Sequence, residues 1–248
     1  MMALFDDIGA VFDASVNWPK RLAHEEPFYR RLFAQHGVSS VLDAACGPGH
    51  HAAMFHRWGM RVQGADLSAT MIERARAHHG EGSGLEWAVR GYETPAPAAF
   101  DAVICVGNSL ALAPDRASAR RAVVSMMAAA QKLVVIHLAN MWAWPEGECL
   151  WQKCLRAVLP QGPATIVKGV HRSADRPFIE LLVISGEEVP TMSTESVELL
   201  GLEAAELEDM LRNGGASRVA MRGGYREEEY KRATSVDLIA VATKSSAP

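Results

Sequence analysis

Short apolar runs alternate with amphipathic segments through the first 138 residues of the chain. The runs predict buried strands, and the amphipathic segments, whose apolar positions recur with helical spacing, predict helices. Such alternation is typical of a parallel sheet that is covered by helices on both faces. We expect strands at 38–44, 61–65, 85–89, 100–107 and 133–138, and helices at 20–36, 50–58, 69–78 and 115–131.

The pattern changes after Leu138. Residues 139–163 carry three of the six tryptophans, and β-like stretches follow at 165–171, 178–185 and 192–199. Consecutive strands with short loops predict an antiparallel meander. A helix at 203–212 and strands at 217–221 and 236–243 return to the α/β pattern. The predicted organisation is an N-terminal helical cap segment (1–37), an α/β core (38–138 and 200–248) and a β-rich insertion (139–199) that covers the substrate site.

Composition narrows the possible partners and location. The 248 residues are 49% hydrophobic and 22% charged, as in ordinary globular proteins, and the net charge of −4 argues against nucleic acid and anionic membranes as partners. No apolar run approaches the ~20 residues of a membrane span, and the first residues lack a signal-peptide pattern. The four cysteines show no metal-ligand spacing, so we expect reduced thiols, a cytoplasmic location and no metal. A homo-oligomer stays possible.

A glycine-rich turn follows the first predicted strand. The segment Val41-Leu42-Asp43-Ala44-Ala45-Cys46-Gly47-Pro48-Gly49-His50 reads as strand, turn and helix start, which presents backbone N–H groups to a ligand. Asp66 ends the next strand, where a carboxylate can bind ribose hydroxyls. The spacing Gly47-x-Gly49-x-x-Ala52 also fits a dinucleotide site. Asp43, however, disfavours a pyrophosphate and suits a ligand that carries an ammonium group.

Three motifs in order resemble those of the class I S-adenosylmethionine-dependent methyltransferases. They are the segment 41–50, the segment Gly64-Ala65-Asp66-Leu67-Ser68-x-x-Met71-Ile72, and Phe100-Asp101-Ala102-Val103-Ile104-Cys105-x-Gly107-Asn108-Ser109-Leu110. The resemblance implies a Rossmann-like, mostly parallel seven-stranded sheet whose last strand is antiparallel. The segment Asn17-Trp18-Pro19-Lys20-Arg21-Leu22 and the triplet 107–109 further resemble the glycine/sarcosine N-methyltransferase-like branch.

The resemblance also implies a cofactor, S-adenosyl-L-methionine, with S-adenosyl-L-homocysteine as its product. Asp66 would bind the ribose, Arg21 the carboxylate of the cofactor, and Trp18 would form a wall of its site. The methionine part would lie against Asp43, Ala44, Cys46, Gly47 and Gly49, and the adenine end against Leu67, Met71, Tyr92 and Glu93. Val106 is a further predicted cofactor contact. Tyr92 stands where many members have the acid that binds the adenine amine, so Glu93 or a backbone carbonyl is the alternative.

Methyl transfer is an in-line displacement that depends mainly on alignment and on the exclusion of water. A neutral amine acceptor needs no strong base, whereas a hydroxyl or an acidic carbon does. We therefore expect a small-molecule acceptor, with an amine nitrogen favoured. The predicted catalytic residues are Asn108, His137 and Asn140, and the predicted substrate contacts are Ser109, Trp142, Trp144 and His171.

Three alternatives stay open at this point. The first is an O- or C-methyltransferase that uses His137 as its base, since the unperturbed pKa of histidine lies near neutrality. The second is an NAD(P)-linked oxidoreductase built on the same glycine loop. The third is a non-catalytic module that binds S-adenosylmethionine.

Overall fold

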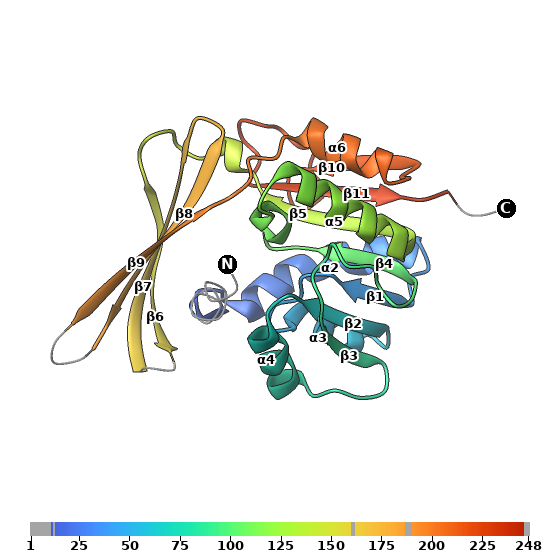
Figure 1. Ribbon diagram of the computed structural model, residues 1–248, viewed down its shortest axis with the longest axis horizontal. Coiled ribbons are helices and arrows are strands. Elements are labelled where there is room, and N and C mark those ends of the chain that lie inside the picture. The colour runs from blue at the N-terminus through green and yellow to red at the C-terminus, as the bar shows by residue number, and fades with distance from the viewer. Residues whose placement is uncertain (1–10, 12, 160–161, 187–189, 246–248) are drawn as a thin grey trace.

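The computed structural model describes residue 11 and residues 13–159, 162–186 and 190–245, and its strands form two sheets (Figure 1). The larger sheet has seven strands in the order β10-β11-β5-β4-β1-β2-β3. Its strands are β1 (Ser40–Asp43), β2 (Arg61–Asp66), β3 (Leu85–Val89), β4 (Phe100–Cys105), β5 (Ala130–Ala139), β10 (Arg218–Arg222) and β11 (Asp237–Thr243). The predicted α/β class is therefore confirmed.

The centre of this sheet is parallel, and its last strand is not. β1 pairs in parallel with β2 and with β4, so Val41 stands beside both Val62 and Ala102. β11 runs antiparallel to β5 and to β10. This arrangement confirms the antiparallel last strand that the family resemblance implied.

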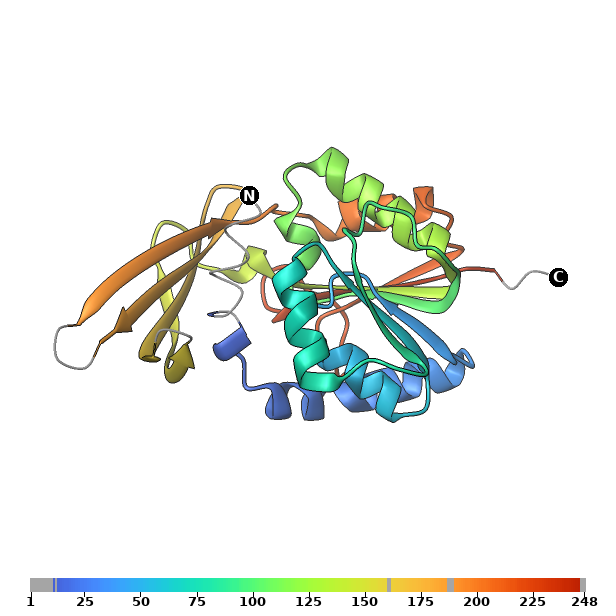
Figure 2. The same ribbon diagram turned by 60° about the horizontal axis from the view of Figure 1, so that its bottom comes forward.

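Helices cover both faces of the sheet (Figure 2). One face carries α2 (Trp18–Gln35) and α3 (His50–Arg57), and the other carries α5 (Arg116–Ala129) and α6 (Ala204–Asn213). α4 (Ala69–His79) begins where predicted, because the Ser68 hydroxyl caps it by accepting from the Met71 N–H at 3.2 Å. α2 buries Phe28, Tyr29 and Phe33 under the sheet. Among the described residues no helix is long and apolar enough to cross a membrane.

The insertion is a four-stranded antiparallel sheet with the order β6-β7-β8-β9. The predicted meander corresponds to β7 (Gly162–Ser173), β8 (Arg176–Ser185) and β9 (Thr191–Glu198). Its first strand, β6 (Leu150–Leu159), is missing from the prediction, because tryptophans and prolines obscured the strand pattern of 139–163. This sheet follows the carboxyl end of β5 and stands at that edge of the core (Figure 1).

The predicted three-part division stays a prediction. Part of the proposed cap segment, residues 1–10 and 12, lies outside the described residues, as do 160–161, 187–189 and 246–248.

Candidate functional site

The glycine turn lies between the carboxyl ends of β1 and β2. Gly47 and Gly49 both have positive φ angles, 52° and 85°, which favour glycine. A Cβ atom on Gly49 would lie 2.4 Å from the Trp87 ring, so this position is closed by packing. A Cβ on Gly47 would meet nothing within 4 Å. The turn therefore packs against the protein at Gly49 and borders open space at Gly47.

Asp43 ends β1 as a fully buried carboxylate, with 0% exposure. Neither side-chain oxygen has a hydrogen-bond partner among the described residues. Burial, together with the negative charge of Asp66, raises the pKa of Asp43 to about 8. An unpaired buried carboxylate is costly. Its presence here indicates a site that is completed by a cationic or hydrogen-donating ligand.

Asp66 ends β2 and holds the turn in place. Its carboxylate accepts hydrogen bonds from the Gly47 N–H at 2.8 Å and from the Ser68 N–H at 2.9 Å. Burial raises the pKa of Asp66, and these backbone donors oppose that shift. The structure thus brings Asp43, Gly47 and Asp66 together, as the sequence predicted.

Helix α2 places the positively charged side chain of Arg21 near the carboxyl ends of the same strands. The Arg21 guanidinium lies 3.5 Å from the position of a Cβ on Gly107, and its charge acts on Asp43. It also lies over the Trp18 ring, 5.1 Å from the ring centroid. The predicted pair Trp18 and Arg21 therefore stands beside the site, at the end of α2 that precedes the core.

Arg21 is fixed by a buried acid that the sequence analysis did not select. Glu25 accepts from Arg21 Nε at 2.7 Å and pairs with His51 Nε2 at 2.6 Å. Burial raises the pKa of Glu25, but the hydrogen bonds and charges of His51 and Arg21 outweigh it and lower the pKa to about 2. The i, i+4 spacing of Arg21 and Glu25 was a signal for this ion pair. No signal linked it to His51.

His137 has both ring nitrogens engaged. Its Nδ1 accepts from the Gly107 N–H at 3.1 Å, and its Nε2 lies 3.1 Å from the carboxylate of Asp237. Asn108, at φ 72°, accepts from the Ala139 N–H through its side-chain oxygen. His137 and Asn108 thus join the ends of β4 and β5. In this arrangement His137 lacks a free lone pair for general-base work.

Asn140 is 1% exposed, and its side chain forms hydrogen bonds with the segment before β11. Its Nδ2 donates to the carbonyls of Arg232 and Ser235 at 2.9 and 2.8 Å, and its Oδ1 accepts from the Tyr230 hydroxyl at 3.0 Å. Its amide therefore has no free group for a substrate in this structure. Trp142 donates from Nε1 to the Leu202 carbonyl at 3.2 Å.

The other predicted substrate contacts are dispersed. Ser109 donates to the Val106 carbonyl at 2.9 Å. Trp144 packs, partly buried, against the core. His171 lies on β7, pairs with Glu180 at 2.9 Å and stacks on Phe178 at 5.0 Å. Trp144 and His171 therefore belong to the insertion side of the molecule, and their role as substrate contacts stays a prediction.

The predicted cofactor contacts differ in exposure. Leu67 is 57% exposed, whereas Met71, Cys46 and Val106 are buried. An exposed leucine directly after Asp66 is available to a ligand. Met71 instead belongs to the buried side of α4.

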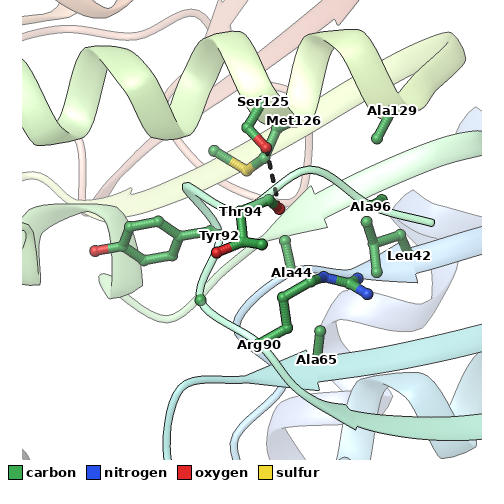
Figure 3. A pocket seen from close by; sticks show the side chains of 11 residues that line it. Leu42, Ala44, Ala65, Arg90, Tyr92, Thr94, Ala96, Ser125, Met126 and Ala129 are labelled. Atoms are coloured by element: carbon green, nitrogen blue, oxygen red, sulfur yellow. Dashed lines mark hydrogen bonds between the residues drawn. The ribbon is translucent and has the colours of Figure 1, made fainter.

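Tyr92 and Glu93 follow β3, and their side chains lie in different surroundings. Tyr92 lines a small cavity of about 10 Å³, and its ring extends away from the other lining side chains (Figure 3). Burial raises the pKa of Tyr92. Glu93 forms an ion pair with Arg121 at 2.8 Å on the surface. Glu93 thus pairs with a residue of α5, and the predicted contacts of Tyr92 and Glu93 with the cofactor stay predictions.

Comparisons with known sequences agree with this geometry. A family model described as "Methyltransferase domain" matches residues 41–132. The glycine/sarcosine N-methyltransferase of Parasynechococcus marenigrum is 36% identical over 110 residues, which are 42% of this chain and 38% of that protein. The glycine N-methyltransferase of Homo sapiens is 32% identical over 137 residues, 47% of this chain and 46% of that protein. The chain thus spans less than half the length of these relatives.

Solved structures resemble the whole chain. An S-adenosylmethionine-dependent methyltransferase from Clostridium acetobutylicum aligns with a TM-score of 0.73 at 12% identity, over 98% of this chain and 96% of that one. The amino pentose methyltransferase CalS10 from Micromonospora echinaspora aligns with a TM-score of 0.72 at 19% identity, over 95% of each chain. At these identities the likeness shows the fold. Motifs, domain match and fold agree: residues 41–132 match a methyltransferase domain, and the chain has the fold of solved S-adenosylmethionine-dependent methyltransferases.

Proposed function

We propose that this chain is an enzyme that transfers the methyl group of S-adenosylmethionine to a small molecule, at an amine nitrogen. The observation that carries the proposal is the Asp43 carboxylate, which is fully buried and has no partner among the described residues. An ammonium group is the ligand chemistry that best compensates a buried carboxylate. The amino acid end of S-adenosylmethionine carries such a group.

The surrounding residues fit the rest of the cofactor. Asp43 would bind its ammonium group, the backbone at Gly47 would border its methionine part, and Arg21 would bind its carboxylate. Asp66, whose oxygens face the turn, would bind the ribose hydroxyls. When bound, the cofactor supplies a methyl group that is activated by a positively charged sulfur. The chain's own residues must then align the acceptor and exclude water.

The surroundings of His137 favour an amine over a hydroxyl or a carbon. Its Nδ1 accepts from Gly107 and its Nε2 pairs with Asp237, so it is a positioning residue for the β4–β5 edge in our proposal. A neutral amine attacks with its own lone pair and needs no base of this kind. An O- or C-methyltransferase would need His137 to release one of these contacts.

The named relatives support an amine acceptor. Glycine/sarcosine N-methyltransferase and the amino pentose methyltransferase are both named for substrates with amino groups. In our proposal the acceptor enters between the core and the β6–β9 sheet, which follows the carboxyl end of β5. A cytoplasmic setting completes the proposal, because Cys46 and Cys105 are buried as free thiols.

Two assays test the proposal in sequence. Calorimetric titration should show binding of S-adenosylhomocysteine and no binding of NAD. Methyl transfer from labelled S-adenosylmethionine is then measured with a panel of amines, phenols and carboxylic acids. Turnover with amines alone supports the proposal.

Three outcomes contradict it in different ways. Binding of NAD without S-adenosylhomocysteine would establish the oxidoreductase alternative. Binding without turnover of any acceptor would indicate a non-catalytic module. Turnover of phenols that disappears in His137→Asn would establish base-assisted O-methylation.

A further inference from the structure

Three histidine side chains from two helices meet beside the glycine turn. His50 is the first residue of α3, directly after Gly49, and His78 and His79 end α4. One ring nitrogen from each lies within 4.8 Å of those of the other two. The ring centroid of His50 lies 5.0 Å from that of His79 and 6.1 Å from that of His78.

This spacing is close to what a metal ion requires. Imidazole nitrogens bind Zn²⁺ at about 2.0–2.1 Å, so two ligand atoms of a tetrahedral site stand about 3.3 Å apart. Small side-chain rotations bring nitrogens within 4.8 Å of one another to that distance. His78 is exposed and can rotate without disturbing the core.

His79 is available as a ligand. Its Nε2 is buried and has no hydrogen-bond partner among the described residues. The lone pair of this nitrogen is therefore not used by any described residue, and the His79 ring lies beside those of His50 and His78.

A carboxylate and an aromatic ring complete the surroundings of His50. Asp13 Oδ1 lies 3.4 Å from His50 Nε2 and also accepts from Trp18 Nε1 at 2.6 Å. The Trp18 ring stacks on the His50 ring at 4.2 Å. A carboxylate that bonds to a ligating histidine is a common device for orienting the ring and strengthening the ligand.

We propose that His50, His78 and His79 form a binding site for a divalent transition-metal ion such as Zn²⁺, with Asp13 as the carboxylate that orients His50. Imidazole ligands suit zinc, copper, iron and nickel better than magnesium or calcium. The sequence predicted no metal, because its cysteines show no metal-ligand spacing, and the fold brings His50 together with the distant pair His78–His79. An ion at this site joins α3 and α4 directly, and it reaches the residues before α2 through Asp13.

Co²⁺ is the probe that tests this site in the 248-residue chain without an affinity tag. Titration near neutral pH should produce a visible absorption band that saturates at one Co²⁺ per chain, and added Zn²⁺ should remove the band. His78→Ala and His79→Ala should each weaken Co²⁺ binding by about 10-fold or more. His24→Ala removes an exposed histidine of α2 outside the cluster and should bind Co²⁺ as the wild type does.

Because His78 is exposed, His78→Ala should fold normally, and circular dichroism checks this. The proposal is overturned if the wild type gives no saturable band, or if His78→Ala and His79→Ala bind Co²⁺ with unchanged affinity. Neither result depends on methyl transfer. A negative Co²⁺ titration would therefore not contradict the proposed methyltransferase activity. Absence of that activity would not contradict the proposed metal site.

Discussion

Replacing Asp43 by asparagine should stabilise the ligand-free protein and weaken cofactor binding. The pKa of Asp43 is about 8 in the folded protein, against 3.8 for an ordinary aspartate. The folded state therefore binds more protons than the unfolded state between pH 4 and 8, and this residue lowers stability as the pH rises through that window. Asparagine removes the charge and should remove this pH dependence.

The size of the effect follows from the same values. At about 1.4 kcal/mol per pKa unit, ionised Asp43 costs about 4 kcal/mol near pH 7 and about 6 kcal/mol above pH 8. The asparagine amide is also buried without a partner, which costs about 1–3 kcal/mol. The net gain in the free energy of unfolding near pH 7 is therefore about 1–3 kcal/mol.

The same change removes the proposed partner of the cofactor's ammonium group. A hydrogen bond to a charged group contributes about 1.5–3 kcal/mol, so affinity for S-adenosylhomocysteine should fall about 10- to 150-fold. In the wild type near pH 7, binding should release close to one proton, because the ammonium group favours ionised Asp43. The variant should release none.

Urea unfolding from pH 5 to pH 8 measures the stability difference between wild type and Asp43→Asn. Calorimetric titrations in buffers of different ionisation enthalpy measure the affinity and the proton release. The reasoning is refuted if Asp43→Asn is less stable than the wild type at pH 8. It is also refuted if this variant binds S-adenosylhomocysteine as tightly as the wild type does.

Three further substitutions, one of them with Glu228→Ala as its control, probe other parts of the site. Asp66→Ala should weaken binding of S-adenosylhomocysteine by about 10-fold or more, whereas Glu228→Ala should leave the affinity unchanged. Equal affinities of the two variants in calorimetry would show that Asp66 does not bind the ribose. Glu25→Gln should lower the free energy of unfolding by about 3 kcal/mol, because it breaks a buried ion pair. That difference should shrink as the pH falls from 4.5 toward 2, and a pH-independent difference in urea unfolding would contradict it. His137→Asn keeps an acceptor for Gly107, so kcat should fall less than about 10-fold; a loss of about 10²–10⁴ in steady-state assays would identify a base.

Most of the core could be predicted from the sequence because local patterns determine it. Each strand–helix unit carries its own apolar period, and caps such as Ser68 mark where helices begin. The glycine turn was equally local, since strand, turn and helix start are contiguous from Val41 to His50. β6 could not be predicted, because its pairing with β7 outweighs a weak local strand pattern.

The surroundings of the site residues could not be predicted, because they depend on contacts between distant segments. His137 pairs with Asp237, 100 residues away, and Asn140 holds the segment that ends at Ser235. No period in the sequence encodes such contacts. The sequence therefore indicated where polar side chains leave the strands, and the fold determines which of them are already engaged.

The attachment of the β6–β9 sheet has a consequence for how this protein can diversify. Only the segments 140–149 and 199–203 connect that sheet to the core, and its strands pair with one another and not with the seven-stranded sheet. Mutations at exposed positions of its strands therefore do not touch the strand pairing around Asp43 and Asp66. Under the proposed function, descendants of this chain can acquire new acceptor preferences by altering exposed positions of the appended sheet while inheriting the β1–β2 edge intact.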